Sequence, residues 1–176
     1  MARFVVHFSN WGSIAYSAQQ SPIEGFPSAR VWSISDGYPY GGTGIPYFMI
    51  SPLDLTYQAL KSNDKCSLIV SLSQTSYCQT QSWDPEDPRC VQVILTGRFK
   101  ELEQDSQEML FARQVVWDRH PPMIDWFVNK RDHDWRFGKL SIEFITILDT
   151  FGGRKYPDVS AYFAAEIPKP YNVLQV

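Results

Sequence analysis

The sequence lacks a hydrophobic run long enough to cross a membrane, and it lacks a marked excess of charge of either sign. A transmembrane helix needs about 20 consecutive apolar residues, and no segment of the 176 residues reaches that length, so we expect no membrane span. Sixteen basic and 19 acidic residues give a net charge of −3, which provides no general attraction to nucleic acid. The short N-terminal apolar run, interrupted by Arg3, His7 and Asn10, is not typical of a signal peptide. We expect a cytosolic protein or a processed form whose first methionine was added.

Cysteine and histidine are scarce, with three residues of each type. The histidines are far apart in the sequence, and neither they nor the cysteines have the spacing of a metal site. No cysteine has the basic neighbour and the orienting acid that activate a nucleophile. We therefore predict no metal site and no catalytic cysteine. The residues concerned are Cys66, Cys78, Cys90, His7, His120 and His133.

Cys78 and Cys90 flank an acidic loop that contains proline, and Cys66 is the odd cysteine. Two cysteines at the ends of a hairpin loop can be bridged if their Cα atoms come within about 7 Å. In an oxidising compartment a disulfide between Cys78 and Cys90 is expected, whereas in the cytosol three buried thiols are the ordinary state. The sequence leaves both alternatives open.

The composition is that of a globular protein. Hydrophobic residues make up 44% of the chain, charged residues 20% and aromatic residues 15%. We interpret residues 1–176 as a single domain with a thick core, and the high aromatic content suggests an additional interface or pocket.

The order of the predicted elements indicates a mainly β (α+β) fold. Strands outnumber helices and do not alternate with them, which favours an antiparallel barrel with flanking helices over a parallel sheet. Strands are predicted at residues 13–19, 31–34, 47–50, 67–72, 90–100 and 140–149. Helices are predicted at residues 2–10 (ending at Gly12), 52–61 and 105–118 (capped by Asp105, with Glu108 three positions on), and residues 121–138 are predicted to be irregular.

A glycine-rich segment, Gly41-Gly42-Thr43-Gly44, lies before the predicted strand at 47–50. It matches neither the dinucleotide-binding fingerprint nor the P-loop, because no strand runs directly into it and no Lys-Ser/Thr pair follows. A phosphate cradle is one reading, and a plain flexible turn is the one we favour.

The strand at 47–50 leads into Ser51-Pro52-Leu53-Asp54. Ser51 is a good helix N-cap, and Pro52 suits the first helical position because its missing N–H is not needed there. We predict that the helix begins here, and capping alone explains the residues without any ligand.

The segment from residue 118 to residue 140 is rich in charged and aromatic residues, including Arg119, His120, Asp134 and Trp135. Such a group can bind an anion or an aromatic ring. It can equally hold an irregular loop against the barrel, because loop backbone needs polar partners. We favour this second interpretation.

Several separated motifs follow one another along the chain. They are Trp11-Gly12, Ser33-Ile34-Ser35-Asp36-Gly37, Gly44-Ile45-Pro46-Tyr47-Phe48, Ser51-Pro52-Leu53, the Cys78 to Cys90 loop, Arg119-His120-Pro121, Trp135 with Phe137-Gly138-Lys139-Leu140, Leu148-Asp149 and Phe151-Gly152-Gly153. Together they resemble the CREG family (cellular repressors of adenoviral early-gene transcription), which is similar in turn to the flavin-binding split barrel of pyridoxamine 5′-phosphate oxidase. The resemblance covers the chain from Arg3 to about Tyr162.

The resemblance implies a six-stranded antiparallel split β-barrel of the FMN-binding type, with flanking helices. It implies a homodimer in the endolysosomal or secreted compartment, without settled enzymatic activity, whose flavin position is occupied or disabled. The family is commonly glycosylated, yet no asparagine here is followed two residues later by Ser or Thr. The residues matched to the vestigial flavin cleft are Ser51, Asp54, Gln92, Arg119, His120, Asp134 and Trp135.

FMN binding is the question on which the alternatives divide. In flavin-binding relatives the junction corresponding to Ser51 supplies a hydroxyl and basic residues to the FMN phosphate, but here Pro52 removes a donor and Asp54 adds negative charge. Gln92 falls where such relatives contact the flavin ring, although an outward polar residue is a simpler reading. The leading hypothesis is a non-enzymatic, homodimeric binding or maturation factor without cofactor, acting on an unidentified protein partner or receptor. The alternatives are an FMN-dependent oxidoreductase using Gln92 and Ser51, and a cytosolic relative that binds another small ligand.

Overall fold

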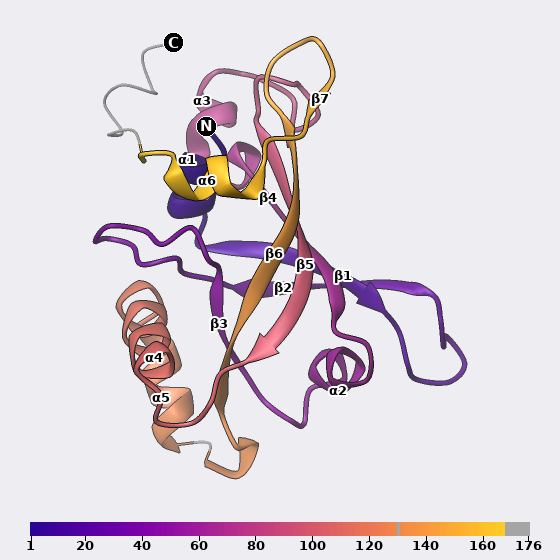
Figure 1. Ribbon diagram of the computed structural model, residues 1–176, viewed down its shortest axis with the longest axis vertical. Coiled ribbons are helices and arrows are strands. Elements are labelled where there is room, and N and C mark those ends of the chain that lie inside the picture. The colour runs from indigo at the N-terminus through magenta and orange to yellow at the C-terminus, as the bar shows by residue number, and fades with distance from the viewer. Residues whose placement is uncertain (130, 168–176) are drawn as a thin grey trace.

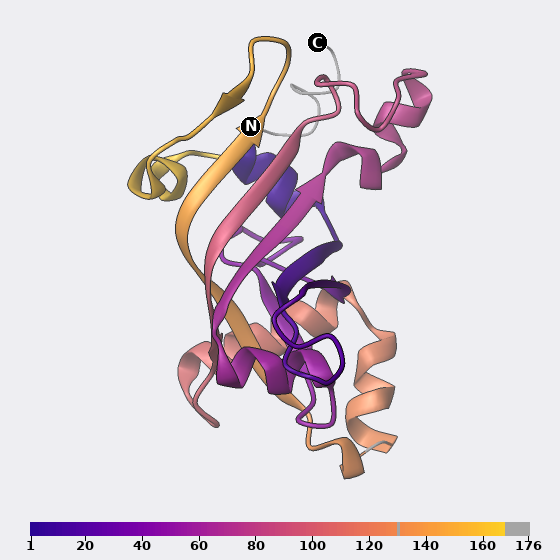
Figure 2. The ribbon, with the colours of Figure 1, turned by 90° about the vertical axis from the view of Figure 1, so that its right-hand side faces the viewer.

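In the computed structural model, which describes residues 1–129 and 131–167, one antiparallel sheet curls into an open barrel (Figures 1 and 2). Neighbouring strands follow the order β2-β1-β4-β5-β6-β3, and a short β7 pairs with the end of β6. This confirms the predicted six-stranded antiparallel split barrel. The strands are β1 (Trp11–Ser17), β2 (Pro27–Ser33), β3 (Tyr47–Ile50), β4 (Lys65–Ser71), β5 (Gln92–Glu101), β6 (Arg136–Leu148) and β7 (Arg154–Lys155).

The helices flank the sheet. Figure 1 shows α1 and α6 together near one end of the sheet, with α4 and α5 beside β3 towards the other, and contacts between α1 and α6 and between α4 and β3 agree with this view. The helices are α1 (Ala2–Phe8), α2 (Leu55–Ser62), α3 (Ser76–Thr80), α4 (Gln107–Arg119), α5 (Pro122–Asn129) and α6 (Val159–Ala164), with 3-10 turns η1 (Leu72–Gln74) and η2 (Arg131–His133).

The main core lies inside the curl of the sheet. Alternate residues of β5, among them Val93, Leu95 and Phe99, are buried there, because side chains along a strand point to opposite faces. They join Leu68 of β4 and Val5 of α1 in one cluster. A second cluster packs α4 and α5 against β3 and the start of β6. The two clusters fix both ends of the barrel.

A β-bulge between Thr96 and Gly97 bends the long β5–β6 ladder. A Cβ atom at Gly97 would overlap the carbonyl oxygen of Ser141 on β6, so only glycine permits this backbone approach. Bulges increase the local twist and bend of a sheet, and here the bend helps the sheet to curl.

The predicted end of the first helix is wrong. Helix α1 ends at Phe8, and Gly12 is not its stop signal but a residue of β1, where an added Cβ would meet Leu68 and the Ile69 carbonyl of β4. Gly12 is thus required by close strand packing.

Helix α2 begins at Leu55 instead of at Pro52, and its N-cap is Asp54, which accepts a hydrogen bond from Thr56 N at 2.8 Å. Ser51 and Pro52 belong to the preceding turn. The predicted cap at Ser51 is wrong because an acidic cap three residues later competes with it.

The predicted cap of α4 is also wrong. Asp105 has a left-handed φ of 62°, and the cap is Ser106, whose Oγ accepts from Met109 N at 3.1 Å. Glu108 does not reach back to the cap; its carboxylate instead accepts from Lys139 Nζ at 2.6 Å and from Tyr47 Oη at 3.1 Å.

The segment 121–138, predicted to be irregular, is mostly ordered into elements. It contains α5 and η2, and β6 already begins at Arg136. Pro122 occupies the first helical position, where proline is favourable, and Met123 is buried against α4. Strands β2 and β6 each begin four residues earlier than predicted, β3 matches at both ends, and β1, β4 and β5 match to within two residues.

Candidate functional site

Three predicted site residues line one hollow where the barrel is split. Ser51, Asp54 and Trp135 lie in a groove of about 490 Å³ bounded by residues 30–33 of β2, residues 49–51 at the end of β3 and helix α5. We call this hollow the split groove. Its lining includes Trp32 and Trp126, so part of its wall is aromatic.

The polar groups at the β3 end of the split groove already have partners. The Ser51 hydroxyl donates to the carbonyl oxygen of His133 and accepts from Leu53 N at 3.2 Å. Asp54 forms an ion pair with Arg30 at 2.7 Å. Among the described residues lining the groove, Arg30 is the only lysine or arginine. A phosphate dianion needs uncommitted cations or several free N–H groups, so these residues do not fit the FMN phosphate.

Trp135 is held rigidly. Its Nε1 donates to the carbonyl oxygen of Trp126 at 2.9 Å, and the ring of His133 stacks on it at 5.1 Å between centroids. Asp134 lies beside it but faces another hollow, of about 240 Å³, which both residues line together with Arg136 and Glu101.

Charged groups in this second hollow form a closed network. Arg136 donates to Asp134 Oδ2 at 2.6 Å and to Glu101 Oε1 at 2.8 Å, and the Tyr57 hydroxyl donates to Glu101 Oε2 at 2.8 Å. Burial alone raises the pKa of Glu101, but hydrogen bonds from Arg136, Tyr57 and Lys61 outweigh it and place the pKa below its ordinary value. Glu101 is therefore a carboxylate acceptor at neutral pH and not a general acid.

Arg119 and His120 lie outside the 240 Å³ hollow and the split groove, and they join the end of α4 to α1 and to the segment that follows β2. The Arg119 guanidinium donates to the carbonyl oxygens of His7 and Phe8 at 2.9 and 2.8 Å and stacks over the ring of Tyr38. His120 Nε2 donates to the carbonyl oxygen of Ile34 at 3.0 Å. Burial lowers the pKa of both side chains. These contacts agree with the anchoring role that we favoured from the sequence.

Gln92 is far from the other predicted cleft residues within one chain. It pairs with Leu148 at the end of β6, whereas Ile50, next to Ser51, pairs with Arg136 at the start of β6. Twelve strand steps of about 3.3 Å separate these pairs. The amide of Gln92 donates weakly to Pro85 O at 3.4 Å, so a single chain does not bring Gln92 and Ser51 to one ligand.

A buried polar cluster beneath the glycine-rich segment was not predicted. Asp36 Oδ1 lies 2.8 Å from His7 Nδ1, both side chains being almost inaccessible, and Asp36 Oδ2 accepts from Gly44 N at 3.2 Å. Arg3 donates to Gly42 O, and a Cβ at Gly42 would strike both Asp36 and His7. The segment is therefore a turn held from below by a carboxylate, which argues against a phosphate cradle. The Ser35-Asp36-Gly37 triplet was the available sequence signal.

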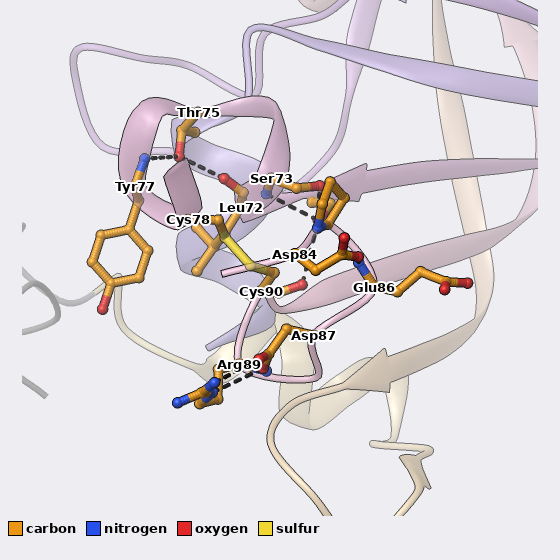
Figure 3. Close-up of a disulfide and its surroundings, with 12 residues drawn as sticks. Leu72, Ser73, Thr75, Tyr77, Cys78, Asp84, Glu86, Asp87, Arg89 and Cys90 are labelled. Carbon is orange, nitrogen blue, oxygen red and sulfur yellow. Dashed lines mark hydrogen bonds and ion pairs between the residues drawn. A yellow bond between two sulfur atoms is a disulfide. The ribbon is translucent and has the colours of Figure 1, made fainter. Parts of the chain in front are cut away.

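The two cysteines that flank the acidic loop are bridged (Figure 3). The Cα atoms of Cys78 and Cys90 lie 5.8 Å apart, and the described free cysteine is Cys66, which is buried. Burial raises the pKa of the Cys66 thiol to about 12. An ion pair within the loop, between Arg89 and Asp87 at 2.6 Å, also stabilises it.

Protein produced in a secretory host is expected to show one titratable thiol in denaturant without reductant, from Cys66, and three after reduction. Loss of the bridge in a Cys78→Ser/Cys90→Ser double variant should lower the free energy of unfolding by about 2–3 kcal/mol, because a short loop is no longer closed in the unfolded chain. A Cys66→Ala variant, as control, should show no thiol before reduction. Three thiols in the unreduced parent would contradict the pairing.

No helix within residues 1–129 and 131–167 is long and apolar enough to cross a membrane. Over the same residues, no group of three or more His, Cys, Asp or Glu side chains could hold a metal ion.

The fold described above defines a split-barrel protein. The structure is similar to a heme-binding protein from Mycobacterium smegmatis (TM-score 0.67, 18% identity, 94% of this chain and 60% of that one). It is also similar to a pyridoxinephosphate oxidase family protein from Clostridium acetobutylicum related to general stress protein 26 (TM-score 0.57, 12% identity, 87% and 88%). At these identities the likeness concerns the fold alone.

Within that class the relationship is specific. The family model "CREG, beta-barrel" matches residues 1–164, and Protein CREG1 of Gallus gallus is 38% identical over 165 residues, covering 93% of this chain and 83% of the chicken protein. The chain belongs to the CREG family.

Proposed function

We propose that this protein is a non-enzymatic, homodimeric binding or maturation factor of the endolysosomal or extracellular space, with a cleft that does not hold FMN. The observation that carries the proposal is the state of the split groove, where Ser51 and Arg30 are already bound to His133 and Asp54. The partner is an unidentified protein or receptor and not nucleic acid. The Cys78–Cys90 bridge supports an oxidising compartment.

The purified protein is expected to be colourless, and titration with FMN should give neither visible absorbance on the protein nor calorimetric binding tighter than about 1 µM. The physical reason is that the split groove offers no unpaired lysine or arginine, among its described residues, to bind the FMN phosphate. Riboflavin, which lacks the phosphate, is the matched control ligand and should behave in the same way.

An Asp54→Arg variant tests the cause. It releases Arg30 and adds a cation, so it should bind FMN more tightly than the parent while leaving riboflavin unaffected. Sub-micromolar binding of FMN by the parent would favour the alternative, an FMN-dependent oxidoreductase. If the Asp54→Arg variant binds FMN no more tightly than the parent does, the aromatic walls of the groove, and not its charge, prevent FMN binding.

The outer face of the central strands supports the homodimer. Ile69, Ile94 and Phe144 are partly exposed there, and the register places Ile94 between Ile69 of β4 and Thr146 of β6. Hydroxyl and charged groups surround this apolar centre, including the Arg98–Glu143 ion pair. An apolar centre within a polar rim is typical of subunit interfaces, and a two-fold axis would place it against its own copy.

A further inference from the structure

The barrel is split between β2 and β3, because one residue pair joins their ends and the pairing does not continue along the strands. Ser35, which follows the end of β2, and Tyr47, the first residue of β3, exchange two backbone hydrogen bonds at 3.0 and 2.8 Å and form an isolated bridge. Continuing that register would place Ser33 opposite Met49 and Val31 opposite Ser51. Neither pair is a bridge among the described residues, and the split groove begins there.

Within residues 1–129 and 131–167, one edge of β2 consequently has no strand beside it, and the strand that pairs with β2 is β1. Ile34 N donates to Asn10 O and Ala18 N donates to Phe26 O, so the even-numbered residues of β2 bond to β1, because bonded pairs alternate along an antiparallel ladder. The N–H and C=O groups of Ala29, Val31 and Ser33 therefore point away from β1.

Hollow surface lies on both sides of this edge. The split groove adjoins Val31 and Ser33 on the inner side. A different hollow, of about 410 Å³ and lined by Trp11 and His120, adjoins the same two residues. The side chain of Val31 is itself unprotected, with 57% of its surface exposed. An added strand would send alternate side chains into these two hollows.

The charges around the edge are balanced. Arg30, which is on β2, is neutralised by Asp54 at 2.7 Å, and burial disfavours the charged form of His120. Proteins commonly protect a free strand edge with an unpaired charge, and the described part of this edge carries none. An uncharged segment is therefore its electrostatic complement.

We propose that the free edge of β2 binds an extended, uncharged peptide segment of a partner protein by strand addition, with a large apolar side chain in the split groove. Main-chain hydrogen bonds to Val31 and Ser33 hold the segment, and the walls formed by Trp32 and Trp126 select the inserted side chain. The inference rests on the proposed binding role and names the kind of partner.

Amide hydrogen exchange of the full chain tests the proposal. The probes are acetylated, amidated heptapeptides of alternating threonine and apolar residues, with Val, Leu, Phe or Trp at the centre. At a free peptide concentration of ten times its Kd, binding should slow amide exchange at Val31 and Ser33 by about tenfold. Exchange at Trp32, whose amide already faces β1, should change little.

Two controls separate strand addition from other binding. A heptapeptide N-methylated along one edge keeps its side chains but loses its donors, and it should no longer protect Val31. On the protein, Val31→Pro removes the edge N–H and should abolish binding, whereas Val31→Thr keeps it and should bind as the parent does. The peptide control needs no protein variant, so it holds even if Val31→Pro fails to fold.

The proposal is overturned if none of the four peptides protects these amides at about 1 mM, or if the N-methylated peptide binds equally well. Protection that grows with protein concentration alone would assign the edge to a second copy and also overturn it. FMN binding would instead contradict the proposed function while leaving this readout unchanged, so the two failures are distinguishable.

Discussion

Replacing Asp36 with alanine is expected to lower the free energy of unfolding by about 3–5 kcal/mol. The carboxylate is fully buried, lies 2.8 Å from His7 Nδ1 and accepts from Gly44 N. Its removal leaves these two donors without an acceptor in an interior that also holds the buried side chain of Arg3. For a chain of this size, the melting temperature should fall by about 10 °C.

Thermal and urea unfolding of three variants measures this effect. Asp36→Asn keeps an acceptor for Gly44 N–H without the charge and should lie between parent and alanine variant. Asp87→Ala removes a carboxylate from an exposed ion pair with Arg89 and should shift the midpoint far less. Equal shifts for Asp36→Ala and Asp87→Ala would show that the cluster is not a stabilising element.

A Phe144→Asp variant is expected to be monomeric under conditions where the parent is a dimer. Phe144 is half exposed in the single chain, and its ring contacts Tyr156 at 5.6 Å, so it lies within the proposed apolar interface. Each interface would then bury two unpaired carboxylates, and the dimer should weaken by at least about a hundredfold.

Light scattering at micromolar protein concentration gives the mass, expected to be twice the 20.3 kDa of one chain for the parent and once that mass for the variant. Phe26→Asp is the matched control, because Phe26 is more exposed than Phe144 but lies between β1 and β2. A monomeric parent, or a Phe144→Asp variant that remains dimeric, would contradict the proposed interface.

The strand content was predictable because it depends on local sequence. The run Tyr47 to Ile50 is aromatic and branched and is bounded by turn residues, and β3 has those two ends. The long strands β5 and β6 were also identified, although their pairing and the bulge at Gly97 depend on contacts across the sheet.

The errors arose where distant contacts decide between local alternatives. Ser51 was a reasonable helix cap by sequence, but its hydroxyl is taken by the carbonyl of His133, 82 residues away. Helix α5 was missed because packing against α4 and β6 stabilises it. Its apolar residues, such as Met123 and Phe127, contact those elements, which the local sequence does not show.

The site was only partly predictable for the same reason. Asp134 and Trp135 are neighbours in sequence and line a common hollow, whereas Gln92 was grouped with Ser51 by resemblance and lies at the other end of β6. The Asp36–His7 pair joins residues 29 positions apart, and Arg3 bonds to the adjacent glycine-rich segment, so the Ser35-Asp36-Gly37 motif could draw attention to Asp36 but could not reveal its partner.

The glycine-rich turn accepts hydrogen bonds from Arg3 and from Tyr162, which lie far apart in the sequence. This has a consequence for synthesis on the ribosome. Tyr162 donates to Gly44 O across 118 residues, and Arg3 donates to Phe163 O across 160. Because the chain is synthesised from the N-terminus onward, α1 and the glycine-rich turn cannot form these two bonds until α6 has been made. Contacts of such long range are slow to form, so the nascent barrel remains unfastened, and open to chaperones, until α6 has left the exit tunnel.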